Sequence, residues 1–78
     1  MSKQQIEECV RASLEGYFHD LDGIEPNDLH AMLLKIVEKP LLEVVMARAG
    51  DNQSKAADWL GLNRNTLRKK LVEHQLLK

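Results

Sequence analysis

A chain of 78 residues with a single cysteine has few ways to support its own core. A domain of this length buries only about 60–65% of the surface that its unfolded chain exposes, and its core supplies no more than about 3–5 kcal/mol of net stability. Small domains therefore add disulfides, a structural metal or a partner chain. Cys9 has no second cysteine to pair with, and His19, His30 and His74 are too scattered for a zinc site. We predict no metal, no cofactor, and association with a second copy of the chain.

Charge divides the chain into two parts. Residues 1–50 carry five basic and nine acidic side chains, a net charge of −4, whereas residues 51–78 carry six basic and three acidic ones, a net charge of +3. We interpret residues 1–50 as an acidic dimerisation region and residues 51–78 as a basic binding region, within one structural domain. No run of eighteen apolar residues is present, and the first eight residues contain no apolar signal core. We therefore expect no membrane contact and, with one thiol, a cytoplasmic protein.

Hydrophobic periodicity predicts an all-α chain with four helices. The first ends near Asp22 and Gly23, and Cys9 is expected to be half-buried on it. The second runs from 29 to 49 after Pro26, Asn27 and Asp28, and the third and fourth span 53–60 and 64–75. Because the periodicity stays in phase across Pro40, we expect one helix kinked there rather than two. The predicted apolar stripes are Ile6, Val10, Leu14, Tyr17, Phe18 and Leu21 in the first helix and Leu33, Ile36, Val37, Leu41, Val44 and Val45 in the second.

The last two predicted helices have the spacing of a helix-turn-helix. Ala57 is a small residue where the helices cross, Gly61 lies four positions later in the turn, and Leu67 lies where the second helix packs inward. Asn52 and Asn63 can cap the two helices. With Leu67 inward, and with about 100° between successive residues, one face of the last helix points away from the core. That face carries Asn65, Thr66, Arg68 and Lys69, flanked by Arg64 and Lys70.

This outward face has the chemistry of a DNA-binding surface. Positive side chains neutralise phosphates, and Asn, Thr and Arg near the start of a recognition helix can reach base edges. The N-termini of both helices are also favourable anion sites. We therefore predict double-stranded DNA as the partner, and since no pair of groups suggests acid–base or nucleophilic chemistry, we predict no enzyme. The alternative from another class is a helical interaction module whose basic face binds an acidic protein surface.

The segment GDNQSKAADWLGLNRNTLRKKL closely resembles the C-terminal helix-turn-helix of the Fis family of bacterial nucleoid-associated proteins. The similarity continues upstream through EKPLLEVVMARAG, in which Pro40 matches a proline of the family's long second helix, and it covers roughly residues 6–75. The resemblance implies a homodimer in which the first two helices of each chain intertwine. Its recognition helices enter successive major grooves, and because they lie closer together than one turn of DNA, the duplex must bend. It also implies a nucleoid-associated transcription regulator with low, shape-based sequence specificity.

Carried over residue by residue, the resemblance places the DNA contacts at the starts of the last two helices and along the second of them. Arg64 is expected to reach a guanine edge and Asn63 a base beside it, while the others contact phosphates. The complete set is Asn52, Ser54, Lys55, Asn63, Arg64, Thr66, Arg68, Lys69 and Lys70.

The sequence departs from the family in its basic residues and in its N-terminal arm. Val72 and Glu73 stand where enteric members have basic residues, and Gly50 replaces another, so we expect weaker non-specific binding and less wrapping of flanking DNA. Only about five residues precede the first helix, so contact with a recombinase through an N-terminal arm is not expected. Among DNA-binding proteins, the nearest alternative is the DNA-binding end of an NtrC-like activator.

Overall fold

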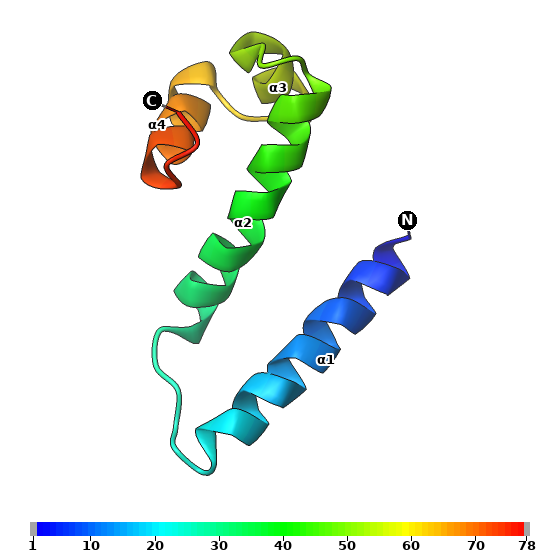
Figure 1. Cartoon of the computed structure of the whole chain (residues 1–78), viewed down its shortest axis with the longest axis vertical. Helices are drawn as coiled ribbons and strands as arrows, with labels where there is room; N and C mark the ends of the chain where they lie inside the picture. The colour runs from blue at the N-terminus through cyan, green and yellow to red at the C-terminus, as the bar shows by residue number, and fades with distance from the viewer. Residues whose placement is uncertain (1, 78) are drawn as a thin grey trace.

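The computed structural model describes residues 2–77, and this range contains four α-helices and no strand. They are α1 (Lys3–Leu21), α2 (Leu29–Arg48), α3 (Gln53–Leu60) and α4 (Arg64–Glu73). In Figure 1, α1 and α2 form an open hairpin, and α3 and α4 gather at the end of α2 that lies far from the hairpin loop. The prediction of an all-α chain with four helices is confirmed.

Local hydrogen bonds and left-handed residues set the helix ends. Ser2 and Gln5 form a capping box at the start of α1, with Ser2 Oγ accepting from the Gln5 N–H at 3.2 Å. Asp22 ends α1 with a φ of 50°, as the sequence suggested. Asp28 precedes α2 but makes no side-chain capping bond, so the capping expected there is absent. α4 ends at Glu73 rather than 75, because Gln75 adopts a φ of 60° that a helix cannot continue.

α2 remains one helix across Pro40, so the predicted continuity is confirmed. Proline removes one backbone N–H from the helix, and a single lost bond is tolerated where the flanking turns are held by packing. The kink at Pro40 stays a prediction.

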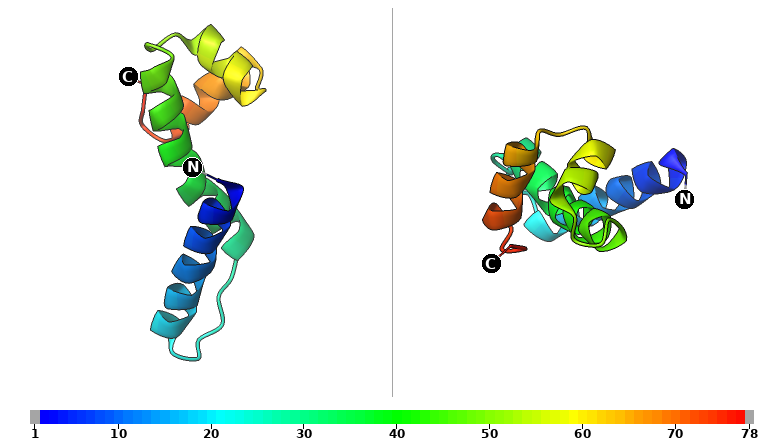
Figure 2. Two further views of the ribbon diagram at one scale, coloured as in Figure 1. Left: turned by 90° about the vertical axis from the view of Figure 1, so that its right-hand side faces the viewer. Right: turned by 90° about the horizontal axis from the view of Figure 1, so that it is seen from above.

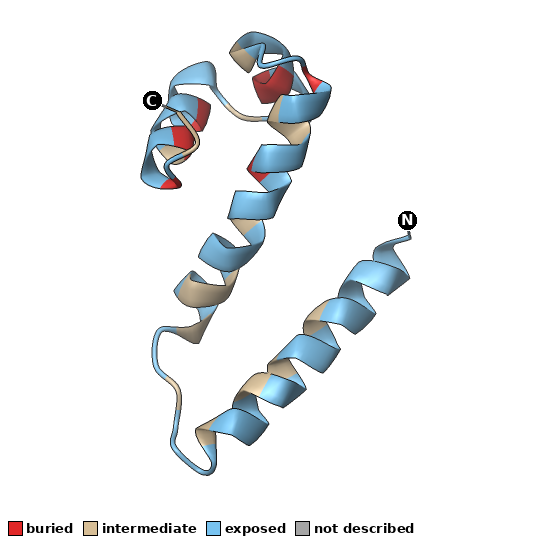
Figure 3. Cartoon of the chain, viewed as in Figure 1, coloured by how far each residue is buried: buried red, intermediate tan, exposed pale blue. Residues whose placement is uncertain are grey.

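Within residues 2–77, the buried residues all lie where α2, α3 and α4 meet (Figure 3). α1 buries none of its residues, so its apolar stripe is only half-covered or exposed. Cys9 is exposed rather than half-buried, because no neighbouring element covers its face of α1. The core consists of Leu42, Ala49, Ala56, Ala57, Leu67 and Leu71.

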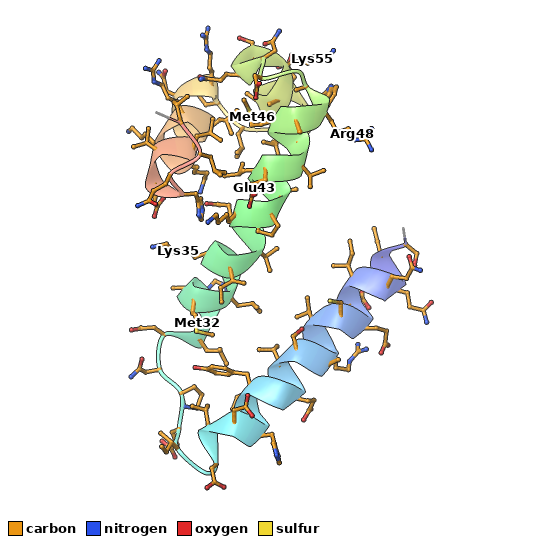
Figure 4. All side chains as sticks on the ribbon, in the orientation of Figure 1. Met32, Lys35, Glu43, Met46, Arg48 and Lys55 are labelled. Carbon is orange, nitrogen blue, oxygen red and sulfur yellow. The ribbon has the colours of Figure 1, made fainter. Side chains whose placement is uncertain are left out.

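α2 is apolar on two sides, and the chain covers only one of them. The covered side packs against α3 and α4 through Leu42, Val45, Met46 and Ala49. Figure 4 shows Met46 on the side of α2 toward α4 and Arg48 on the opposite side. The members of the predicted stripe of α2 therefore divide: Val45 packs against the core, but several others are exposed in the single chain. Those exposed members are Ile36, Val37, Leu41 and Val44, with exposed fractions of 44–60%.

The single chain is more extended, and exposes more surface, than a compact chain of its mass. A compact chain of this length has a radius of gyration of about 11.5 Å, whereas this one has 15.0 Å and extends over 44 × 27 × 18 Å. It exposes 6494 Å², and a compact monomer of 8.9 kDa exposes about 4,800 Å². The views in Figure 2 show the same extended arrangement from the side and from above.

Removing a buried leucine from α4 should strongly destabilise the helix-turn-helix. Leu67→Ala, at a fully buried position, is expected to lower the free energy of unfolding by about 2–5 kcal/mol, because it removes apolar contacts and leaves a cavity. Val72→Ala, at a position of the same helix with 56% exposure, should change it by no more than about 0.5 kcal/mol. Urea unfolding followed by far-UV circular dichroism measures both, and equal losses would contradict this assignment of the core.

Candidate nucleic-acid interface

The helix-turn-helix is built on small residues at its centre. Ala56 and Ala57 are buried, so the backbone of α3 comes close to both α2 and α4. Gly61 ends α3 with a φ of 71°, and the next residue, Leu62, donates its N–H to the Ala57 carbonyl at 3.0 Å. Leu67 then points back into the core. The predicted crossing of two helices through Ala57, Gly61 and Leu67 is therefore confirmed.

Both helix starts are capped by asparagine, as the sequence predicted. Asn52 Oδ1 accepts from the Lys55 N–H at 3.1 Å, and Asn63 Oδ1 accepts from the Asn65 N–H at 2.8 Å. Capping commits the side-chain oxygen of Asn63 and leaves its amide NH₂ as the group that can donate to a base. The N-termini of α3 and α4 carry partial positive charge, which favours a phosphate beside either of them.

The outer face of α4 is polar and basic from Arg64 to Lys69. Leu67 and Leu71 are its buried residues, which fixes the opposite face toward solvent. Arg64, Arg68 and Lys69 are exposed, and within residues 2–77 none of the three forms an ion pair. The predicted contact residues exposed on or beside α4 are Asn63, Arg64, Thr66, Arg68 and Lys69.

Three exposed residues at the start of α3 extend this surface. Asn52, Ser54 and Lys55 are exposed there, and Figure 4 shows Lys55 at the end of the molecule formed by the helix-turn-helix. The ammonium of Lys55 lies 5.4 Å from the ring centroid of Trp59, one turn further along α3. This cation–π contact keeps Lys55 close to the helix surface while its charge stays accessible. Trp59 is itself exposed, at the turn end of α3.

Lys70 differs from the other predicted contact residues. It is partly buried, and its Nζ lies 2.9 Å from Glu38 Oε2 on α2. The other oxygen of the same carboxylate, Oε1, lies 2.9 Å from His74 Nε2, one turn further along α4. An ionised carboxylate can only accept hydrogen bonds, so Nε2 of His74 carries the proton and donates.

Glu38 was missed by reasoning from the sequence. Its one signal is its position four residues before buried Leu42, which places it on the covered side of α2. A histidine near the end of a helix is expected to interact with the helix dipole, but the side chain of His74 is only 4% exposed and its partner is Glu38.

The bridge between α2 and α4 shifts two pKa values in opposite directions. Hydrogen bonds from Lys70 and then from His74 hold the pKa of Glu38 below its usual value of 4.5, although burial opposes this. The Glu38 carboxylate in turn raises the pKa of Lys70 above its usual value of 10.5. The Glu38–Lys70 pair therefore stays ionised across the neutral pH range.

The described residues offer neither a metal site nor a transmembrane segment. Among residues 2–77, no three histidine, cysteine, aspartate or glutamate side chains come together as a metal site requires. No helix in that range combines the length and the apolarity needed to cross a bilayer.

Comparison with known proteins agrees with this geometry. The bacterial regulatory proteins of the Fis family match residues 33–74, which span most of α2 and all of α3 and α4. A protein of Ralstonia nicotianae named as a Fis-like DNA-binding protein is 57% identical over 77 residues, covering 99% of this chain and 100% of its own length. One of Neisseria meningitidis serogroup A with the same name is 60% identical over 72 residues, covering 92% and 91%. DNA-binding protein Fis of Aliivibrio fischeri is 43% identical over 74 residues, covering 95% of this chain and 76% of its own length.

The stability that Glu38 contributes should depend on pH. Because its pKa is lowered in the folded chain, its contribution is present above pH of about 4.5 and is lost as the pH falls through the lowered pKa. Glu38→Gln is expected to cost about 1–2 kcal/mol at neutral pH and progressively less below pH of about 4. Urea unfolding across this range measures the difference, with Glu43→Gln, an exposed position of the same helix, as the control. A cost for Glu38→Gln that does not change with pH would contradict the ionised bridge.

Proposed function

The chain belongs to the Fis family of bacterial regulatory proteins, and we propose that it is a homodimeric regulator that binds and bends double-stranded DNA. The observation that carries the proposal is the outer face of α4, where Arg64, Arg68 and Lys69 are exposed and unpaired within residues 2–77. A face of this kind attracts phosphates, and the asparagine-capped start of α4 brings short polar groups to the same end.

Each predicted contact residue has a proposed role. Arg64, in the first turn of α4, donates to a guanine edge, and the free amide NH₂ of Asn63 donates to a neighbouring base. Lys70 is the weakest of the phosphate contacts because Glu38 already neutralises its charge. The remaining phosphate contacts are Asn52, Ser54, Lys55, Thr66, Arg68 and Lys69.

The second copy of the chain is proposed to cover the uncovered side of α2. Leu34, Val37, Leu41 and Val44 are exposed and follow one another at intervals of three and four residues, which is the spacing of a helix–helix seam. The protomer exposes about 1,700 Å² more than a compact monomer of its mass, and an excess of this size on each chain is what a stable dimer interface removes. The apolar stripe of α1 supplies further surface to the same interface.

A dimer with two recognition helices on one side explains the proposed bending. In a two-fold dimer the helices must enter successive major grooves, and a separation shorter than one turn of DNA is accommodated by curving the duplex. Specificity is then low and depends on DNA deformability as well as on Arg64 and Asn63. We place this activity in the bacterial cytoplasm, at the nucleoid, with no catalytic role.

Two substitutions in α4 should weaken DNA binding in different ways. Arg64→Ala is expected to reduce the preference for a selected site by about 1–3 kcal/mol, because it removes a base contact. Lys69→Ala should weaken binding to all sequences alike and reduce the salt dependence of affinity by about one phosphate contact for each protomer.

Gel-shift titrations at several salt concentrations measure both effects. The control is Lys35→Ala, an exposed position that Figure 4 shows on the part of α2 away from α3, and it should bind as the wild type does. Absence of any shifted species at low salt would contradict DNA binding and would favour an acidic protein surface as the partner of α4.

An acidic residue on the uncovered side of α2 should break the dimer. Leu41→Asp is expected to convert a two-chain particle into single chains, because the carboxylate would be buried in an apolar interface. Val72→Asp, at an exposed position of α4 outside that seam, should leave the dimer intact. Sedimentation equilibrium gives the mass of each, and a wild type that sediments as a folded single chain would contradict the dimer.

A further inference from the structure

Glu38 makes a two-point contact between α2 and the recognition helix. Its Oε2 lies 2.9 Å from Lys70 Nζ and its Oε1 lies 2.9 Å from His74 Nε2. Lys70 and His74 are four residues apart and therefore lie one above the other on the same face of α4. Two contacts from one carboxylate to successive turns resist rotation of α4 about its own axis as well as sliding along α2.

The apolar core contacts α4 at a different place from Glu38. Leu67 and Leu71 pack with Ala56, Ala57 and Leu42, and apolar packing is non-directional, so it fixes the depth of a helix better than its tilt. Glu38 is partly buried, and the side chain of His74 is almost fully buried, so the hydrogen bond between them is shielded from competing water. The C-terminal half of α4 is thereby tied directly to α2.

A small tilt of α4 would displace its N-terminal end, where Arg64 lies. A helix of ten residues is about 15 Å long, so a tilt of about 10° about its C-terminal end moves its first residues by about 2.6 Å. Hydrogen bonds to a base edge are made within a window of about 0.5 Å. The anchoring of Lys70 and His74 therefore bears directly on whether Arg64, at the opposite end of α4, meets a base.

We propose that Glu38 is a positioning residue for DNA recognition. It fixes the tilt and rotation of α4 through Lys70 and His74, and by neutralising the charge of Lys70 it weakens the unspecific phosphate contact of that residue. This inference rests on the proposed DNA binding through α4. It assigns to an acidic residue outside the helix-turn-helix a direct effect on sequence preference.

The proposal predicts that Glu38→Gln separates specificity from affinity. Loss of the anchor should lower the ratio of affinities for a selected duplex and a scrambled duplex of equal composition by about fivefold or more. Release of Lys70 should steepen the salt dependence by about 0.9 for each copy of Lys70 that reaches a phosphate. Glu43→Gln removes the same charge from an exposed position of α2. It should change neither the ratio of affinities nor the salt dependence.

The test uses a duplex that the wild-type protein enriches from a random pool. The wild type and each variant are titrated against this duplex and against the scrambled duplex. His74→Phe is the second variant: it fills the buried site without donating to Glu38, so it should lower the ratio and leave the salt dependence as in the wild type. If Glu38→Gln does not fold, His74→Phe decides, and an unchanged ratio overturns the proposal.

Two further outcomes separate this proposal from the proposed function. Equal behaviour of Glu38→Gln and Glu43→Gln, in a protein whose wild type binds DNA, overturns the positioning role and leaves DNA binding in place. A wild type that enriches and shifts no duplex overturns DNA binding itself, and the positioning role with it.

Discussion

α2 is apolar on two sides, and this property determines how the rest of the chain can be arranged. One side, with Leu42 and Ala49, supports α3 and α4, so the helix-turn-helix has a core although it is short. The other side, with Val37, Leu41 and Val44, is exposed in the single chain. A helix with two apolar faces is stable in water only when both are covered. The helix that supports α3 and α4 is therefore also the helix that we propose a second chain covers.

The parts of the fold that local chemistry fixes were predictable from the sequence. Asn52 and Asn63 cap helices because short polar side chains reach the first free N–H groups, and Gly61 ends α3 because it adopts positive φ without steric cost. The crossing of α3 and α4 followed from the small size of Ala57 and the inward position of Leu67. Each of these signals lies within a few residues of the feature that it determines.

The features that depend on distant residues were not predictable in the same way. Periodicity shows that Val37 and Leu41 are apolar, but not whether this chain or another covers them, so one predicted stripe joined residues from both sides of α2. The Glu38–Lys70 pair joins residues 32 positions apart, and charge patterning along the sequence gives no register between α2 and α4. Lys70 was accordingly grouped with the solvent-facing cations, although its ammonium is paired.

The distribution of charge favours one orientation of the molecule toward the proposed DNA partner. Residues 1–50 carry a net charge of −4 and residues 51–78 a net charge of +3, and Arg64, Arg68 and Lys69 lie exposed on the outer face of α4. In the field of a polyanion such as the proposed DNA partner, the acidic region is repelled and the basic region attracted, so approach is favoured in one orientation. Glu38 refines this pattern at short range, because it pairs with Lys70 in the C-terminal part of α4 and leaves Arg64, Arg68 and Lys69 as the unpaired cations of that helix within residues 2–77. The positive charge that remains is thus confined to the outward face of α4, which is the face that we propose meets DNA.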